Sequence, residues 1–402
     1  MTPGGRYFPV GVWHPHLVTS SAMANPHERP GSKEPDLQLV TRGLTKVLGG
    51  TPPAWTAEPL THNRLNQVTA GIWRVRWNGA SAVVKVLADG PVAEAPAGWE
   101  ASDDPTHWNY WRREARVYVD GLPEAYADSG CGAPRLLAAD ERPGRVALWL
   151  EDVVGTPGSD IGVDGIVAVA GALGRAQGRL SAGGLIPQRY WLSRRFLRDY
   201  IASKRVDRRL LDNDDAWRQP LVADAAPTGL RRAALRLRAE RSRLLQLIES
   251  MPRTLAHLDA WPNNVVLRPD GEPVLLDWAF AGDGAIAEDV GNLVPDSVFD
   301  LFLPAARLPE LDAAVFEAYR AGLRTAGWHR DDRWARLAMC ASAVKYEWLA
   351  PLMIADAGSA QGDYGGERAV DAPRRFAERG AALVFLESWV DEALHLARRL
   401  GV

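Results

Sequence analysis

Residues 254–280 read TLAHLDAWPNNVVLRPDGEPVLLDWAF, and this stretch decides the fold. Two short apolar runs, at 264–267 and 273–278, flank the turn sequence RPDG, which predicts a β-hairpin. His257 and Asp259 precede this hairpin, Asn264 begins it, and Asp277 follows its last aliphatic residues. Phosphoryl transfer needs a carboxylate that accepts the hydroxyl proton and hard oxygen ligands that hold Mg²⁺. We therefore predict that Asp259 faces an acceptor hydroxyl and that Asn264 and Asp277 bind Mg²⁺; the alternative is that these Asx residues only form turns.

A lysine-bearing strand and a glutamate-bearing helix precede this stretch. Alternating runs at 72–77 and 81–87 surround an Asn-Gly pair, which predicts a hairpin with Lys85 on its second strand. Glu114 lies midway through a helix expected over 108–122, where it can orient Lys85 while Lys85 holds phosphate oxygens. The alternative for Glu114 is a surface ion pair, since three arginines share its helix.

The phosphate-covering loop has a weak signature. Gln67, Thr69 and Gly71 precede Lys85, and we expect them at a turn whose backbone N–H groups cover the phosphates. Gly71 stands alone, without a Gly-x-Gly-x-x-Gly string. The chain also lacks Gly-x-x-x-x-Gly-Lys-Ser/Thr, which argues against a P-loop enzyme.

Together these motifs resemble the aminoglycoside phosphotransferase (choline kinase-like) family, which has a protein-kinase-like fold. The resemblance runs from about residue 60 to 350, with Leu258 and Trp278 where protein kinases usually have Arg and Phe. It implies that Asp259 is the catalytic base, that Asn264 and Asp277 are Mg²⁺ ligands, and that Lys85 binds the phosphates of ATP or GTP.

Two further segments carry the resemblance. LWLEDVVG (148–155) looks like the family's hinge, which implies that the backbone around Glu151 and Val153 faces the nucleotide base. GDGAIAEDVGNLV (282–294) is similar to the family's Gly-Asp-Pro-x-x-Asp-Leu-Ala segment, with Asp289 at the acidic position. We expect Asp289 to brace the catalytic loop and His257 to be a structural histidine.

The pattern along the chain predicts an α+β, bilobal protein-kinase-like fold with a small β-rich N-lobe and a larger, mostly helical C-lobe. We expect a disordered lead over 1–35, with Met23 as an alternative start, the N-lobe over 36–153 and the C-lobe over 154–402. The N-lobe should hold a helix from Asp36 to Gly49 and a strand over 145–153, and residues 254–295 should be a non-helical island. Long helices are expected over 163–181, 190–211, 228–250, 308–327, 331–354 and 373–400.

Composition narrows the class of protein. The 402 residues carry 47 Lys and Arg against 50 Asp and Glu, so no global basic field predicts a nucleic-acid partner. Two cysteines exclude a disulfide framework, and no apolar run approaches the ~20 residues of a membrane helix. We expect a cytoplasmic protein with no membrane partner, and we interpret an arginine-rich helix around 231–243 as a solvated face rather than an RNA-binding patch.

The acceptor is the least determined part of the prediction. Seven acids against two arginines lie between Ala285 and Arg320, which favours a cationic acceptor in contact with Asp296 and Asp300; the alternative is that these acids only solvate helix starts. We expect an aminoglycoside or another amino-sugar antibiotic or natural product, with a sugar or amino-alcohol kinase of primary metabolism as the alternative. The string at 345–348 and the tryptophans Trp328, Trp334 and Trp348 are candidate cleft residues.

Two other classes of protein fit the sequence less well. A protein kinase is disfavoured because only 12 residues separate Asp277 from Asp289, which leaves no platform for a peptide. A non-catalytic nucleotide-binding module predicts the loss of Lys85, Asp259, Asn264 or Asp277, and the chain has all four.

Overall fold

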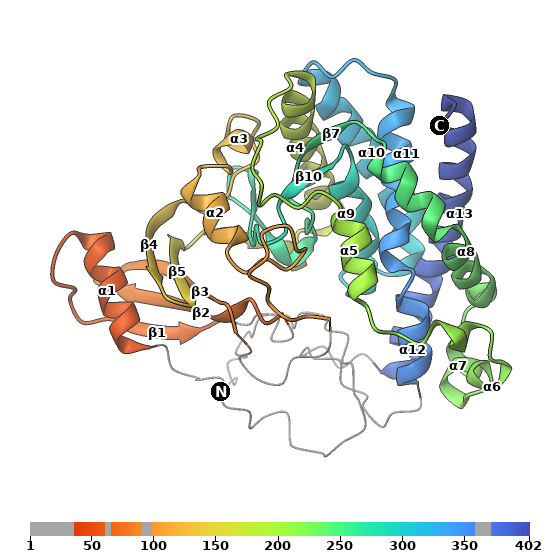
Figure 1. Cartoon of the computed structure of the whole chain (residues 1–402), viewed down its shortest axis with the longest axis horizontal. Coiled ribbons are helices and arrows are strands. Elements are labelled where there is room, and N and C mark those ends of the chain that lie inside the picture. Colours follow the sequence, from red (N-terminus) through yellow and green to blue (C-terminus); the bar gives the residue numbers. More distant parts are fainter. Residues whose placement is uncertain (1–35, 61–65, 91–97, 358–370) are drawn as a thin grey trace, which may run out of the picture.

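The structure is a computed structural model that describes residues 36–60, 66–90, 98–357 and 371–402. The expected disordered lead and Met23 lie outside these residues. Figure 1 shows a β-sheet region at one end of the molecule and a larger helical region at the other. This arrangement confirms the predicted α+β fold class.

The strands form one five-stranded sheet and two small ones. The large sheet is antiparallel throughout, in the order β1-β2-β3-β5-β4, and the small sheets pair β10 with β7 and β8 with both β6 and β9. The strands are β1 (Thr56–Pro59), β2 (Thr69–Trp77), β3 (Ala80–Ala88), β4 (Leu136–Arg142), β5 (Arg145–Glu151), β6 (Thr156–Pro157), β7 (Arg253–Ala256), β8 (Val265–Leu267), β9 (Pro273–Leu275) and β10 (Gly282–Ala285).

Helices make up most of the rest. The α-helices are α1 (Leu37–Leu48), α2 (Arg113–Val119), α3 (Glu124–Ala127), α4 (Gly162–Ala182), α5 (Phe196–Ser203), α6 (Asp214–Trp217), α7 (Pro220–Ala225), α8 (Leu230–Glu249), α9 (Glu288–Phe299), α10 (Leu308–Thr325), α11 (Asp332–Ala341), α12 (Leu349–Asp356) and α13 (Ala372–Leu400). The 3₁₀ turns are η1 (Gly158–Asp160), η2 (Arg208–Leu211), η3 (Pro262–Asn264), η4 (Ala305–Arg307) and η5 (Ser342–Tyr346).

The large sheet has two buried faces because its strands alternate between two hydrophobic clusters. On β3, Val84 and Val86 face α1, while Leu87 belongs to the cluster shared with α2. On β5, Trp149 faces α1 and Leu148 faces the other side. Successive side chains of a strand point to opposite faces, so Lys85 projects toward α2 and the helical region.

The sheet and most helices agree with the prediction, and four differences are corrections. Residues 254–295 are not a non-helical island, because α9 begins at Glu288; this helix is buried on nearly all sides and contains Pro295, a residue that usually ends or kinks a helix. The helix expected over 108–122 is limited to α2. The helices expected over 190–211 and 331–354 are each interrupted, by the segment between α5 and η2 and by η5.

One segment, Asp332–Asp356, is long and apolar enough to span a membrane, with a mean hydropathy of 1.2 over its best window. All of that window is buried among other helices, which is the packing of a core segment. The sequence patterns did not single it out, because charged residues interrupt its apolar runs.

Candidate functional site

A cleft of about 360 Å³ is lined by residues of the large sheet and of the helical region. It brings together the predicted site residues that lie farthest apart in sequence: Lys85, Glu114, Glu151, Val153, Asp259, Asn264, Asp277, Asp296 and Asp300. We call the part formed by Lys85, Glu114, Glu151 and Val153 the sheet side of the cleft. The part formed by Asp259, Asp296, Asp300 and Lys345 is the helical side.

Lys85 forms the centre of a buried ion-pair cluster on the sheet side. Its Nζ lies 2.6 Å from Glu114 Oε2 and 2.7 Å from Asp277 Oδ1. Both Lys85 and Glu114 are buried, so the surface ion pair considered for Glu114 is excluded. Burial opposes the charge of Lys85, but Asp277 and Glu114 together raise the pKa of its ammonium above the ordinary value. The lysine is therefore held charged, with its donors aimed at the cleft.

The loop between β7 and η3 has a strained backbone conformation, which hydrogen bonds to Asp289 hold in place. Leu258 has a left-handed backbone with φ of 65°, which is uncommon for a side chain of this kind. Asp289, at the start of α9, accepts hydrogen bonds from the backbone N–H of His257 at 2.9 Å and of Leu258 at 2.6 Å, and Gln177 Nε2 donates to it at 2.6 Å. Asp289 thus holds the backbone of this loop from the start of α9.

His257 also supports the loop, with its ring inside the core. Its Nε2 lies 2.8 Å from the carbonyl oxygen of Leu276, and its Nδ1 faces the backbone N–H of Asp259 at 3.3 Å. Burial lowers the pKa of His257 to about 4, so the ring is neutral and Nε2 donates while Nδ1 accepts. This arrangement links the loop of Asp259 to the strand end that carries Asp277.

Asp259 and Asn264 face each other at the floor of the cleft. The amide nitrogen of Asn264 donates to Asp259 Oδ2 at 2.8 Å and to the Asp259 carbonyl oxygen at 3.0 Å. Because the amide nitrogen is committed to Asp259, the amide oxygen of Asn264 is turned away from it. Burial raises the pKa of Asp259 to about 7, although the nearby Lys345 charge opposes this. A carboxyl group with a pKa near neutrality is suited to accepting a proton.

Asp277 lies at a second strained backbone position, with φ of 56°. Its Oδ1 contacts Lys85 and accepts a weak hydrogen bond from the N–H of Ala279 at 3.4 Å. Despite burial, Lys85 holds the pKa of Asp277 below its ordinary value, so the carboxylate stays charged. Asp277 and Asn264 provide one carboxylate and one amide oxygen. This donor set fits Mg²⁺, which commonly binds one or two protein ligands and completes its shell with water and substrate phosphates.

The predicted hinge lies at the end of β5, and its two acidic side chains form ion pairs with arginines. Glu151 Oε1 accepts from Arg268 at 2.8 Å, and both oxygens of Asp152 accept from Arg74 Nε, at 3.0 and 2.8 Å. The acidic side chains are thus neutralised by arginines, while Glu151, Asp152 and Val153 line the cleft.

The prediction that Gly71 lies at a turn is wrong. Gly71 is inside β2, opposite Val86, and it does not line the cleft. A Cβ at this position would lie 2.1 Å from the ring of Trp73, so the glycine makes room for that ring. The connection between β1 and β2 spans residues 60–68, and its central residues 61–65 lie outside the described chain.

The model of the phosphotransferase enzyme family matches residues 113–334, more than half of the chain. The protein belongs to this phosphotransferase family. The match confirms the resemblance drawn from the motifs, and it makes the protein a kinase-type enzyme. The comparison with curated proteins gives no significant match.

Three solved structures similar to this phosphotransferase are an amicoumacin kinase with AMP-PNP, Ca²⁺ and Ami, an aminoglycoside phosphotransferase from Streptomyces rimosus with ADP and streptomycin, and an aminoglycoside phosphotransferase from Alicyclobacillus acidocaldarius. Their identities to this chain are 13%, 16% and 15%, with TM-scores of 0.47, 0.41 and 0.45. The alignments cover 89%, 79% and 84% of this chain and 93%, 99% and 92% of those proteins.

Most of the acids that suggested a cationic acceptor are engaged away from the cleft of the phosphotransferase. Three pair with arginines: Glu310 with Arg307 and Glu317 with Arg320 near the surface, and Asp312 with the largely buried Arg336. Glu288 accepts from the N–H of Ala285, and Asp289 braces the loop. Asp296 and Asp300 do line the cleft, but Asp296 Oδ2 pairs with Lys345 Nζ at 2.9 Å. The charge of the segment as a whole is therefore no guide to the charge of the cleft.

The helical side contains a wall of aromatic rings that sequence reasoning largely missed. This aromatic wall consists of Trp99, Phe196, Tyr200, Trp261, Phe280 and Trp348, all of which line the cleft. Of the three tryptophans considered from sequence, Trp348 lines the cleft, whereas Trp328 and Trp334 do not. A surplus of tryptophan was the available signal, but sequence alone does not say which rings meet.

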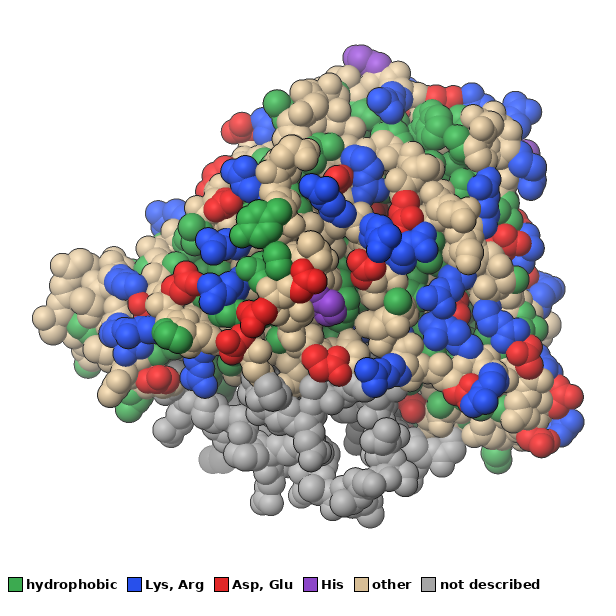
Figure 2. Space-filling view, viewed as in Figure 1, with side chains coloured by type: hydrophobic (Ala, Val, Ile, Leu, Met, Phe, Trp, Pro, Cys, Tyr) green, Lys and Arg blue, Asp and Glu red, His purple; other side chains and the backbone are tan. Residues whose placement is uncertain are grey.

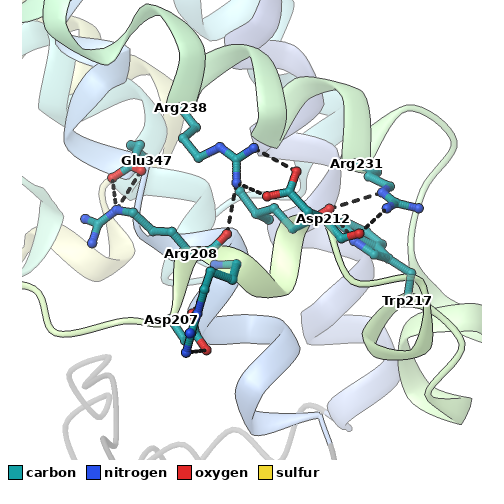
Figure 3. Close-up of polar contacts among 9 residues, drawn as sticks. Asp207, Arg208, Asp212, Trp217, Arg231, Arg238 and Glu347 are labelled. Atoms are coloured by element: carbon teal, nitrogen blue, oxygen red, sulfur yellow. Dashed lines mark hydrogen bonds and ion pairs between the residues drawn. The ribbon is translucent and has the colours of Figure 1, made fainter.

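The segment that carries Trp348 is anchored by an ion pair between the neighbouring Glu347 carboxylate and Arg208. Glu347 is fully buried, and both of its oxygens accept from Arg208 Nε, at 2.8 and 3.0 Å (Figure 3). The same view shows Arg238 paired with Asp212, one of several ion pairs made by the arginine-rich helix α8. Figure 2 shows arginines and lysines interspersed with acids on this face of the molecule. Four of the α8 arginines thus form ion pairs with acids, namely Arg231, Arg232, Arg236 and Arg238.

Proposed function

We propose that this phosphotransferase moves the γ-phosphoryl group of ATP or GTP to a hydroxyl group of a small molecule, with Mg²⁺ as cofactor. The observation that carries the proposal is the meeting of three groups in one cleft: the Lys85–Glu114–Asp277 cluster, the Asp259–Asn264 pair and the hinge around Val153. A nucleotide laid along the sheet side would have its base at the hinge and its phosphates at Lys85. Its terminal phosphate would then lie toward Asp259.

In this mechanism Asp259 accepts the proton of the acceptor hydroxyl as the oxygen attacks phosphorus. Its raised pKa, about 7, makes it a better base than an ordinary exposed aspartate. Lys85 binds phosphate oxygens, and Glu114 fixes its position. Asn264 and Asp277 would hold Mg²⁺, which neutralises charge on the phosphate oxygens when bound. The buried brace from Asp289 keeps the loop of Asp259 in one conformation.

The amino-sugar antibiotics remain candidate acceptors, as do sugars and amino alcohols. A role in antibiotic resistance belongs to the first group only. We also propose a cytoplasmic location, in line with two buried, unpaired cysteines and with the need for ATP or GTP. A nucleotide-binding module without activity is disfavoured because Lys85, Asp259, Asn264 and Asp277 are all in the cleft.

Calorimetry with AMP-PNP and Mg²⁺, followed by ³¹P NMR of reactions with ATP or GTP and a panel of hydroxyl compounds, tests the proposal. We expect Mg²⁺-dependent nucleotide binding and a phosphate monoester in at least one reaction. Binding that is indifferent to Mg²⁺, or a product in which the phosphoryl group resides on an amine, would contradict it.

A further inference from the structure

Five rings of the aromatic wall form one contiguous cluster although they come from distant parts of the chain, and the sixth, Trp261, lines the same cleft while its ring contacts Phe302. Tyr200 lies 6.1 Å from Trp99, 5.4 Å from Phe196 and 6.4 Å from Trp348, measured between ring centroids. Phe280 continues the cluster at 5.1 Å from Phe196. Rings in mutual contact at these distances make a firm apolar surface.

This wall stands beside the proposed base. Trp261 is two residues beyond Asp259, and Phe280 is three residues beyond Asp277. The hydroxyl of Tyr200 is buried, and the charges of Asp259, Asp296 and Asp300 add to that burial in raising its pKa. An acceptor whose hydroxyl reaches Asp259 would therefore lie against these rings.

The faces of several rings are already covered by an amine of the protein. Lys204 is buried, and its Nζ lies 3.5 Å from the ring centroid of Trp99, 3.8 Å from that of Tyr200 and 5.4 Å from that of Trp348. This Nζ has no hydrogen-bond partner among the described residues. Because the Lys204 amine occupies the space over the rings of Trp99 and Tyr200, an ammonium group of a substrate cannot take the same position.

Cations of the protein also offset the carboxylates of the helical side. Lys345 pairs with Asp296 and acts on Asp259, and Arg379 opposes the charge of Asp300. Burial raises the pKa of Asp300 well above its ordinary value, so this carboxyl group resists carrying a charge. Asp300 Oδ1 has no hydrogen-bond partner in the described chain and can accept one from a ligand. The charges of Lys345 and Arg379 thus offset the carboxyl groups of the helical side.

We propose that the acceptor of this enzyme carries a planar apolar ring system next to its hydroxyl group and at most one ammonium group. Its ring packs against the aromatic wall, and a single polar donor reaches Asp300. Ligand sites of this kind are mostly apolar with a few placed polar groups. A polycationic amino sugar fits this side poorly, because it brings several positive charges to a surface where Lys345 and Arg379 already offset the carboxyl groups. This inference rests on the proposed function, since it takes Asp259 as the point where the hydroxyl is held.

Equilibrium binding of three hydroxyl probes tests the proposal. The first two are 4-methylumbelliferyl β-D-glucoside and methyl β-D-glucoside, which share the same sugar and differ only in the aglycone, aromatic in the first and a methyl group in the second. The third is the polycationic amino sugar neamine. Calorimetry is carried out on the full chain with AMP-PNP and Mg²⁺ present. We expect the aryl glucoside to bind at least tenfold more tightly than the methyl glucoside, and neamine to bind more weakly than the aryl glucoside.

Two matched variants locate the effect. Trp261→Leu removes a half-buried ring of the wall and should reduce the preference for the aryl glucoside, whereas Trp55→Leu removes a half-buried ring beside β1, outside the cleft, and should leave it unchanged. Equal behaviour of the two glucosides, including no binding by either, overturns the proposal, and so does tighter binding of neamine. AMP-PNP binding in the same samples reports on the proposed function separately, because the acceptor inference can fail while nucleotide binding persists.

Discussion

On the sheet side of the cleft, charged groups make short, direct contacts: Lys85 is within 2.7 Å of both Glu114 and Asp277. On the helical side, the working surface is a cluster of aromatic rings with carboxyl groups whose charges the protein itself offsets. The sheet side is suited to one constant ligand, a polyphosphate with its metal. The helical side is suited to a ligand that offers an apolar surface for the rings to contact. A phosphotransferase can therefore keep the first side while its acceptor is decided by the second.

The largest expected effect is at Asp259, where the two sides meet. Asp259→Asn keeps the shape of the side chain but removes the proton acceptor, so turnover should fall by at least ~10²-fold while nucleotide affinity stays nearly unchanged. Steady-state kinetics together with AMP-PNP calorimetry measure both quantities. Turnover close to that of the parent enzyme would mean that another group is the base.

A second effect separates the sheet side from the helical side. Lys85→Met removes charge-assisted contacts to phosphate, each worth roughly 1.5–3 kcal/mol, so nucleotide affinity should fall by about tenfold or more. Because this change leaves Glu114 buried without its partner, the double variant Lys85→Met/Glu114→Gln serves as the folded control. If acceptor affinity fell as much as nucleotide affinity, the two sides would not be independent.

A third effect concerns the support of the aromatic wall (Figure 3). Arg208→Met leaves the buried Glu347 carboxylate without its partner and should lower the free energy of unfolding by roughly 3 kcal/mol. We also expect a higher KM for the acceptor with little change in the KM for nucleotide. Arg209→Met is the matched control, since Arg209 is almost fully exposed and pairs only with the exposed Asp207, and its stability should be that of the parent. Equal losses of stability in the two variants would contradict the role of the Arg208–Glu347 pair in supporting the wall.

The smallest effect concerns the lysine enclosed by the wall. Burial, with the charge of Lys345, lowers the pKa of Lys204 well below its ordinary value of 10.5. The folded state thus disfavours the charged amine, and the stability of the parent rises with pH between the lowered pKa and about 10.5. Lys204→Met should stabilise the protein by about 1–2 kcal/mol near pH 7, and this gain should shrink as the pH approaches 10. Guanidinium unfolding of the parent and the variant at pH 7 and pH 9.5 gives the stability gain at each pH. A gain that grows with pH would contradict a lowered pKa for Lys204.

The sheet side and the group Asp259, Asn264 and Asp277 could be predicted because their residues stand at fixed short spacings in recognisable elements. Asp259, Asn264 and Asp277 lie within 19 positions of one another, and Lys85 stands in an alternating strand. What failed was local detail that tertiary packing decides. Gly71 sits in a strand because a tryptophan ring needs the space, and α9 was missed because it contains Pro295 and is buried on nearly all sides by contacts that only the tertiary structure provides.

The helical side could not be predicted for a different reason. The rings of the aromatic wall span positions 99 to 348, and only the packing of α5, the catalytic loop and the segment after η5 brings them together. Lys204 follows the last residue of α5 in an extended conformation, which turns it out of the expected helix and into the rings. Charge counted along the sequence gave the wrong weight to the acids around α9, because most of them have partners elsewhere.

The contact of Lys204 with Trp99 has a mechanical consequence. Trp99 belongs to the segment before α2, and the backbone there is tied down again by Arg113, whose guanidinium donates to the carbonyl oxygens of Trp191 and Ala279. The sheet is therefore joined to the helices at two separated places, the segment near Val153 and this second junction. Rotation of the sheet region against the helical region would break the Lys204–Trp99 contact and the two Arg113 hydrogen bonds, which adds to the free-energy cost of that motion. During exchange of acceptor and product, we therefore expect side chains and short segments at the mouth of the cleft to move more readily than the sheet region as a whole.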